Sequence, residues 1–438
     1  MAAPNLDNLQ GCIVDARQAI QDRQAVTPGL PRYQQLLSEF YSAMAQLPQR
    51  YQQAVAVPCL WMLKQLGPAG YAATLQSPQY APLWESILAV LQAGMGFEEA
   101  ATAAVQEIVS DLYEGFLSEE DRRGIKSPDR SMLTPLVKWG ASRRGPYTFT
   151  CDAMAPLGLQ TAIVNLPVCN ARAGLISWPS LSHETAGHDI LTADDGLLSE
   201  VRELLGATLA SQGYPEHAQY WVARLDETLA DVVSVLNLGP TAVLGFVGHF
   251  RALRSLVLGS PRLTTYEGAS GRYPPDILRA FVQAEVVARL SFSDATAWAD
   301  ALRREIERDL GTPIVIMGRA VDSEQERAVC SVVAEVLASS KLQSLSGHAL
   351  DEIQNWRDSD EAVTVELRRI LQSEDPLPRQ YQEGTYAAHA MAAAVTAAVQ
   401  QQGDPRRLIG RLRTMLVDMH RSNPLWNSRN RSGVFQPS

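Results

Sequence analysis

The chain has 438 residues, 46% of them apolar and 20% charged, which is typical of a soluble globular protein with room for two or three domains. Its formal net charge of −10, with no run rich in Lys and Arg, argues against nucleic acid as a partner. The N-terminus has no basic region followed by an apolar one, and no stretch approaches about 18 uninterrupted apolar residues, so we expect neither a signal peptide nor a membrane partner. Five scattered cysteines without metal-site spacing favour reduced thiols and a cytoplasmic location.

Residues 1–130 are predicted to form an N-terminal helical region. Apolar residues recur there at helical spacing, and Pro-Gly, Gly-Pro and Ser-Pro pairs separate several of the segments. A helical layer of this kind usually buries one apolar stripe against a core, and nothing in it indicates a second functional site. The expected helices cover residues 6–21, 33–47, 51–66, 83–93 and 97–116.

Residues 131–315 are predicted to form a central core with a small sheet. Short runs rich in β-branched and aromatic residues predict strands over 147–150, 161–166 and 174–178. The last of these runs ends at Pro179, and a helix is expected to begin a few residues later. A sheet in this position could present an edge strand to an extended ligand. The alternative is an ordinary small sheet that packs on the helix.

The helix after Pro179 carries the sequence His-Glu-Thr-Ala-Gly-His over residues 183–188. Two histidines with a glutamate between them are what one helix contributes to a catalytic zinc site: the imidazoles bind the metal and the glutamate activates its water. His183 and His188 are five residues apart instead of the usual four, so on a regular helix they would diverge by about 140°. A π-bulge or a tightened turn would bring them together, and Gly187, which lacks a Cβ, lies where this distortion is needed.

The same residues have a structural alternative. Ser182 could cap a helix N-terminus and Glu184 could complement the helix dipole, with both histidines serving only the packing.

A second helix, over residues 224–236, carries two carboxylates on one face. Its apolar stripe includes Leu225 and Leu229, whereas Glu227 and Asp231, four residues apart, lie away from most of that stripe. Glu227 could complete a metal's ligand set, and Asp231 could accept a hydrogen bond from the free ring N–H of a ligand histidine. The alternative is a solvated acidic face.

These two segments resemble the metal site of the dipeptidyl peptidase III family, whose signature is H-E-x-x-G-H. Residues 226–231, Asp-Glu-Thr-Leu-Ala-Asp, are similar to that family's second motif, E-E-x-x-A-E, with aspartate at both ends where glutamate is usual. The resemblance covers only about fifty residues. It implies a gluzincin-like zinc metallopeptidase that binds one Zn²⁺ ion.

The resemblance also implies a role for each matching residue. His183, His188 and Glu227 would bind the zinc ion, Glu184 would be the catalytic base, and Asp231 would orient a ligand histidine. By analogy with zinc peptidases that resemble thermolysin, an edge strand would pair with an extended peptide substrate.

The segments after the second motif hold candidates for stabilising an oxyanion. Hydrolysis of an amide needs a hydrogen-bond donor for the developing oxyanion opposite the metal. Tyr273 is favoured because the two prolines after it restrict its backbone. Alternatively, this tyrosine could have only a structural role and anchor the loop by packing. His249 lies on a very apolar helix expected over 241–258. Alternatively, it could be a histidine of the hydrophobic core without a role in catalysis. The remaining candidates, in the Gly- and Pro-rich loop, are Tyr266 and Arg272.

Residues 316–438 are predicted to form a C-terminal helical region. Alanine-rich residues 386–399 indicate close helix packing, because alanine lets two backbones approach each other. The expected helices from residue 295 onward cover 295–310, 323–342, 361–372, 385–401 and 406–420.

The predicted fold is mainly α with a small β-sheet (α+β), in which N- and C-terminal helical layers wrap a metallopeptidase-like core. We expect a zinc-dependent hydrolase acting on a peptide or small amide substrate. One alternative is a non-haem metal enzyme, an oxygenase or a peptide-tailoring enzyme, on the same ligands. Another is a non-catalytic helical interaction protein with a structural metal.

Overall fold

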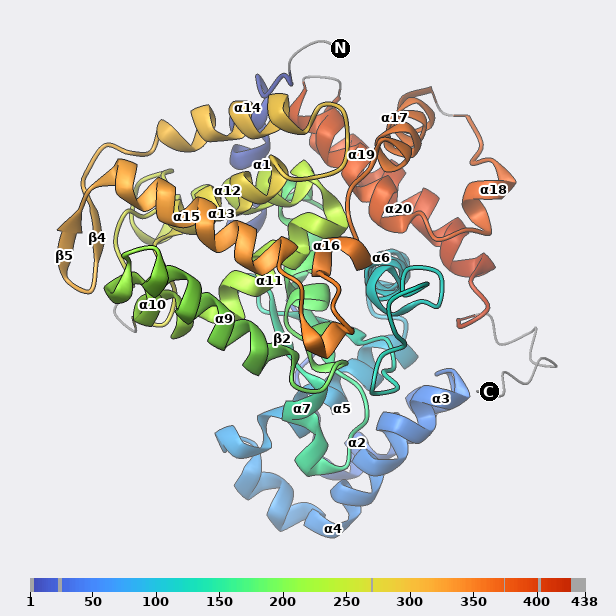
Figure 1. Ribbon diagram of the computed structural model, residues 1–438. Coiled ribbons are helices and arrows are strands. Elements are labelled where there is room, and N and C mark those ends of the chain that lie inside the picture. The colour runs from blue at the N-terminus through green and yellow to red at the C-terminus, as the bar shows by residue number, and fades with distance from the viewer. Residues whose placement is uncertain (1–3, 23–25, 269–270, 374, 401–402, 427–438) are drawn as a thin grey trace.

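The computed structural model describes residues 4–22, 26–268, 271–373, 375–400 and 403–426. Helices make up 64% of the protein and strands 5%, in two small sheets, which confirms a mainly helical fold with a small β part. Helix α11 (Leu225–Leu238) lies near the middle of the molecule, with helices from both ends of the chain around it (Figure 1). All its residues from Thr228 to Leu238 are buried.

The helices of the N-terminal region divide between two hydrophobic cores. Helices α1 and α6 contribute to the larger core, where α1 packs on α12 (Pro240–Val257) and α6 packs on α20 (Pro405–Ser422). Helices α2, α4 and α5 build a second, smaller core. The elements are α1 (Leu9–Gln21), α2 (Tyr33–Met44), α3 (Gln49–Tyr51), η1 (Gln52–Ala56), α4 (Val57–Thr74), η2 (Pro78–Tyr80), α5 (Ala81–Gly94) and α6 (Glu99–Leu117).

A three-stranded sheet has the order β1-β3-β2. Strand β1 (Leu136–Gly140) runs parallel to β3 (Ile163–Pro167), and β2 (Tyr147–Phe149) runs antiparallel to β3. Strands β2 and β3 match the expected segments. Strand β1 was not predicted, because its short run Leu-Val-Lys-Trp-Gly has a lysine at its centre and no clear alternation.

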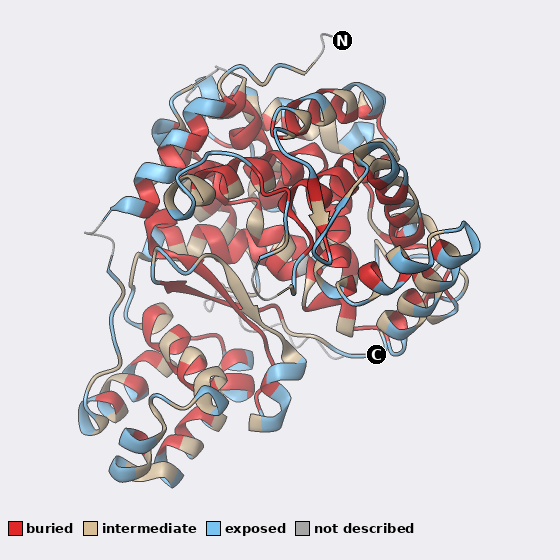
Figure 2. Cartoon of the chain, turned by 90° about the vertical axis from the view of Figure 1, so that its left-hand side faces the viewer, coloured by how far each residue is buried: buried red, intermediate tan, exposed pale blue. Residues whose placement is uncertain are grey.

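The sheet lies between the two cores, as the buried strands in Figure 2 illustrate. Leu136 and Ile163, register partners on β1 and β3, belong to the smaller core. Val137 and Val164, the next pair, belong to the larger core. Alternate side chains of a strand point to opposite faces, so both faces of the parallel pair are covered, which is usual for parallel strands.

The expected strand over 174–178 is wrong. These residues form a 3₁₀ turn, η5 (Leu175–Ser177), that follows Gly174, whose φ is +72°. The N–H of Gly174 donates to the Asp15 carboxylate at 2.8 Å. Periodicity alone does not distinguish a short buried apolar run in a turn from one in a strand. Here the contact of Gly174 with Asp15 on α1 favours the turn.

Most of the remaining helices match their expected segments, and the alanine-rich helix α19 is buried except at His389. A second sheet, β4 (Ile314–Ile316) with β5 (Arg319–Val321), was not predicted; its turn residues Met317 and Gly318 both have positive φ, as a tight hairpin requires. The other elements are α7 (Cys151–Met154), η3 (Ala155–Leu157), η4 (Val168–Ala171), η7 (Ile190–Thr192), α9 (Leu197–Ser211), α10 (Pro215–Val222), α13 (Asp276–Val287), α14 (Ala295–Glu307), α15 (Ser323–Ser339), η8 (Gln343–Leu345), α16 (Leu350–Ile353), α17 (Asp358–Ser373), α18 (Arg379–Gln382) and α19 (Ala387–Val399).

No helix in the described part of the chain is both long and apolar enough to cross a membrane.

Candidate metal centre

The segment that carries the two histidines is a π-helical turn, η6 (His183–Gly187), which follows the short helix α8 (Ser180–Ser182). A π-turn hydrogen-bonds residue i to residue i+5, so it compensates for the extra residue between the histidines. The rings of His183 and His188 face each other edge-on, with centroids 4.7 Å apart. The distortion expected from the spacing is therefore present. Ser182 does not cap the turn; its hydroxyl donates instead to the carbonyl oxygen of Ser234.

Gly187 is needed here for a different reason from the one expected. Its φ is not among the positive values of the chain. A Cβ at this position would lie 2.4 Å from the Cβ of Ala230 and 2.5 Å from its Cα. The glycine thus allows the π-turn to approach the backbone of α11 closely, and this approach sets the distance between the two histidines and Glu227.

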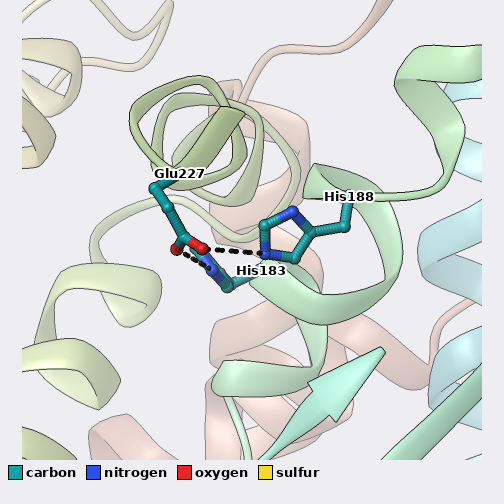
Figure 3. Close-up of side chains that lie close together, drawn as sticks. All are labelled: His183, His188 and Glu227. Carbon is teal, nitrogen blue, oxygen red and sulfur yellow. Dashed lines mark ion pairs between the residues drawn. The ribbon is translucent and has the colours of Figure 1, made fainter. Parts of the chain in front are cut away.

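Glu227, in the first turn of α11, faces both imidazoles (Figure 3). Its Oε2 lies 3.4 Å from Nε2 of His183, and its Oε1 lies 4.0 Å from Nε2 of His188. One ligand atom from each residue lies within 4.8 Å of the others, and no other such group occurs among the described residues. Atoms bound tetrahedrally to one zinc ion lie roughly 3.3 Å apart, so the three donors could hold a metal ion of this size if they moved closer together by up to about 1.5 Å.

A charged pair behind the ligands orients them. The Oδ1 of Asp231, one helical turn after Glu227, lies 3.0 Å from Nδ1 of His183. Arg279, on α13, donates two hydrogen bonds to Asp231, at 2.7 and 2.9 Å. Nδ1 of His183 is thereby held toward Asp231 and its Nε2 toward Glu227, the orientation that a metal ligand needs.

Sequence analysis did not identify Arg279 as part of the site, although an arginine in a mostly apolar helix indicates a buried ion pair. Arg279 is 4% exposed on a helix whose buried residues are mostly apolar, and a buried guanidinium requires a carboxylate partner.

The protonation of the ligand residues is coupled. Burial disfavours a charge on His183, but the nearby carboxylates of Asp231 and Glu227 outweigh this effect and raise its pKa to about 10. Burial and the neighbouring charge of His183 lower the pKa of His188 to about 4. Burial also opposes the charge on Glu227, but the contact with His183 lowers its pKa to about 2. A proton on His183 thus occupies the place of a cation, and a metal ion bound by these residues would have to displace it.

Glu184 is buried, with 8% of its surface exposed, and burial raises the pKa of its carboxyl. The hydroxyl of Thr148, on β2, lies 2.9 Å from Oε2 of Glu184 and 2.8 Å from its backbone carbonyl oxygen. Thr148 was not singled out in the sequence. Its contact positions the glutamate and links the π-turn to the sheet.

A cavity of about 720 Å³ contains these groups. His183, Glu184, His188 and Glu227 line it, and so do all three residues of β2. The four residues considered for an oxyanion, Tyr266, Tyr273, His249 and Arg272, line it as well. Tyr273 is 41% exposed. His249 is buried, lies 3.0 Å from the Ser177 hydroxyl through Nδ1, and has its pKa lowered to about 4 by burial.

The end of the π-turn is anchored by Asp189, a fully buried residue that the sequence did not single out. Its carboxylate accepts hydrogen bonds from the hydroxyl of Tyr113 at 2.7 Å and from the backbone N–H of Cys151 at 2.6 Å. Asp189 follows His188 directly, so these bonds hold the second histidine in place. All five cysteines are free thiols.

Comparisons with known proteins add no relative: no protein-family model matches the chain, and neither the curated proteins nor the solved structures contain a match. The functional assignment therefore depends on the geometry of this centre.

Proposed function

We propose that the chain is a zinc-dependent hydrolase that cleaves peptide or related amide bonds. The observation that carries the proposal is the pairing of a His183–His188–Glu227 set with a buried glutamate in one cavity. Three protein ligands, one fewer than in a closed structural zinc site, are typical of a catalytic centre. A zinc ion bound by these residues would supply a water of lowered pKa and polarise the scissile carbonyl.

Glu184 is the general base in this proposal. It accepts the proton of the attacking water and delivers it to the leaving amine, while the Thr148 hydroxyl holds its carboxylate toward the cavity. Asp231, paired with Arg279, keeps Nε2 of His183 free for the metal. Tyr273 is the proposed donor to the oxyanion, since its position in the cavity wall allows it to reach a bound substrate.

Strand β2 supports an extended peptide as the substrate. Among the described residues only β3 pairs with β2, so the other edge of β2 offers backbone hydrogen bonds. Tyr147, Thr148 and Phe149 line the cavity together with the ligand histidines. A peptide added to this edge would lie along the metal centre, which is the arrangement proposed from the sequence.

The resemblance to the dipeptidyl peptidase III family supports the same chemistry at the metal centre, and its substrate is not transferred to this chain. A non-haem metal enzyme could use the same ligands. The presence of Glu184 favours hydrolysis, because an oxygenase needs no base between its ligand histidines.

The test combines metal analysis with a peptide-library screen. Protein purified without added metal should contain zinc at up to one ion per chain, and it should cleave members of the library. Glu184→Gln should retain the zinc and lose turnover by at least 10²-fold, the contribution of a general base. Glu203→Gln, an exposed glutamate on α9, is the matched control and should behave as the wild type. Iron in place of zinc, or full activity of Glu184→Gln, would refute the proposal.

A further inference from the structure

Two phenylalanines of α12 differ from the rest of that helix. Every residue from Pro240 to Ala252 is buried except Phe246 and Phe250, which keep part of their surface accessible. Both line the cavity of the metal centre. Because the rest of this stretch is covered by protein, the accessible part of each ring opens into the cavity. Large apolar side chains are usually the first to be buried, and here they are the two that remain accessible.

Leu253 extends the same face of the helix. Phe246, Phe250 and Leu253 follow one another at intervals of four and three residues, the spacing of one helical stripe. Leu253 is half-buried and lines the cavity as well. The two rings contact each other, with centroids 4.5 Å apart and planes tilted by 38°. These three residues form an apolar surface that we name the α12 wall.

The guanidinium of Arg279 connects the α12 wall to the metal ligands. Its carbon lies 5.0 Å from the ring centroid of Phe246 and 5.6 Å from that of Phe250. Its Nη2 lies 3.6 Å from Oε2 of Glu227. With a C–N bond of about 1.33 Å, the ring centre of Phe246 lies within about 10 Å of that ligand oxygen. An extended peptide spans about 3.5 Å per residue, so a side chain within about three residues of the cleaved bond can reach the wall.

Two glycines fix the position of α12 beside the metal centre. A Cβ at Gly245 would lie 2.4 Å from the Cβ of Pro179, and a Cβ at Gly248 would lie 2.3 Å from Cγ1 of Ile176. Both partners belong to the segment that leads into the π-turn. The helix therefore packs directly on this segment, and the α12 wall and the ligand histidines are held in one arrangement.

The charges beside the α12 wall are already paired. The guanidinium of Arg254 lies 5.4 Å from the Phe250 ring and donates two hydrogen bonds to Asp276, at 2.8 and 2.9 Å. Arg279 is paired in the same way with Asp231. A charged substrate group placed against the wall would lose hydration while these arginines keep their own carboxylates, whereas an apolar group gains by leaving water.

We infer that the α12 wall is the specificity subsite for a bulky apolar side chain of the substrate, with phenylalanine as the best fit. An aromatic ring can pack on the Phe246–Phe250 pair in an offset or edge-to-face arrangement and cover Leu253. The substrate class of the centre is then a peptide with an aromatic or large aliphatic residue close to the cleaved bond. The inference rests on the proposed function, because it concerns the substrate of the same centre.

The first experiment measures kcat/KM for peptides that are varied at one position at a time, up to three residues on either side of the cleaved bond. Each position carries phenylalanine, leucine, alanine or aspartate. At one of these positions phenylalanine and leucine should be preferred over alanine by about 10- to 100-fold, the gain expected when a large apolar side chain is buried. Aspartate should be the poorest residue at that position.

Variants of the wall test whether it causes this preference. Leu253→Asn, which puts a polar side chain of similar size into the wall, should reduce the preference by about 3- to 10-fold, and Phe250→Ala should reduce it at least as much. Leu258→Asn is the matched control, because the same substitution is made at an exposed residue at the end of α12 that does not line the cavity. Circular dichroism checks that each variant folds.

The preference is a ratio measured within one variant, so a general loss of activity leaves it unchanged. Equal kcat/KM for phenylalanine and alanine at every position would overturn the inference. A preference that neither Leu253→Asn nor Phe250→Ala changes would overturn it as well.

A second experiment separates this inference from the proposed function. Acetylated and amidated tripeptides with phenylalanine or alanine at the centre are titrated into the purified protein, and binding is measured by calorimetry. Tighter binding of the phenylalanine peptide that Leu253→Asn weakens supports the subsite even if no peptide is hydrolysed, a result that would overturn only the hydrolase. Hydrolysis of peptides without tighter binding of the phenylalanine peptide would overturn the subsite and leave the hydrolase standing.

Discussion

Replacing Gly187 by alanine should damage the metal centre without touching any ligand. The added Cβ would lie 2.4 Å from the Cβ of Ala230 and 2.5 Å from its Cα, whereas carbon atoms in contact stay about 3.5–4.0 Å apart. The π-turn and α11 would have to separate by about 1 Å. Glu227 lies three residues before Ala230 on α11, so this separation moves its carboxylate away from the histidines. Overpacking of this kind costs about 1–3 kcal/mol of stability.

The expected results are a lower Tm and a zinc affinity reduced at least tenfold, which corresponds to about 1.4 kcal/mol. Calorimetry measures the Tm, and competition with a chromogenic chelator measures the zinc Kd. Gly410→Ala is the matched control, because a Cβ there meets no atom within 4 Å and the residue lies inside α20. This control should be stabilised by about 0.5–1 kcal/mol, with unchanged zinc affinity. If Gly187→Ala matches the wild type in both measurements, the close approach of the turn to α11 does not set the ligand geometry.

Two further predictions concern a positioning residue and a carboxyl group with a raised pKa. Asp231→Asn should weaken zinc binding by about 10- to 100-fold in the same chelator assay, because the amide cannot hold His183 as the carboxylate does; an unchanged Kd would contradict this role. Asp111, which accepts the N–H of Ala388 at 2.7 Å, has its pKa raised by burial to about 6, so the folded protein retains a proton that the unfolded chain has released. Stability from this group is therefore present below about pH 4, near the unfolded pKa, and is lost as the pH rises through about 6. Asp111→Asn should raise the Tm at pH 8 more than at pH 4, and equal shifts at both pH values would refute the assignment.

Local patterns were sufficient for most of the long helices, although not for α9 and α10, and for the types of residue at the candidate metal centre. Apolar residues at helical spacing identified α11, and the same spacing placed Glu227 and Asp231 on one face, because both depend only on neighbours along the chain. The five-residue separation of His183 and His188 required a distorted turn, since an α-helix cannot align residues at that interval. The three-residue strand β2 could also be predicted, because it is rich in β-branched and aromatic residues.

Contacts between distant segments decided the rest. Arg279 completes the ion pair behind His183 only because α13 packs on α11, and Thr148 reaches Glu184 only because β2 lies beside the π-turn. Gly187 has no positive φ, and a side chain is excluded there by Ala230, 43 positions later in the chain. The apolar run at 174–178 forms a turn because Asp15 binds the N–H of Gly174. Sequence periodicity reports which face of an element is apolar, whereas the partner of that face, and therefore the fine geometry of the site, follows from tertiary packing.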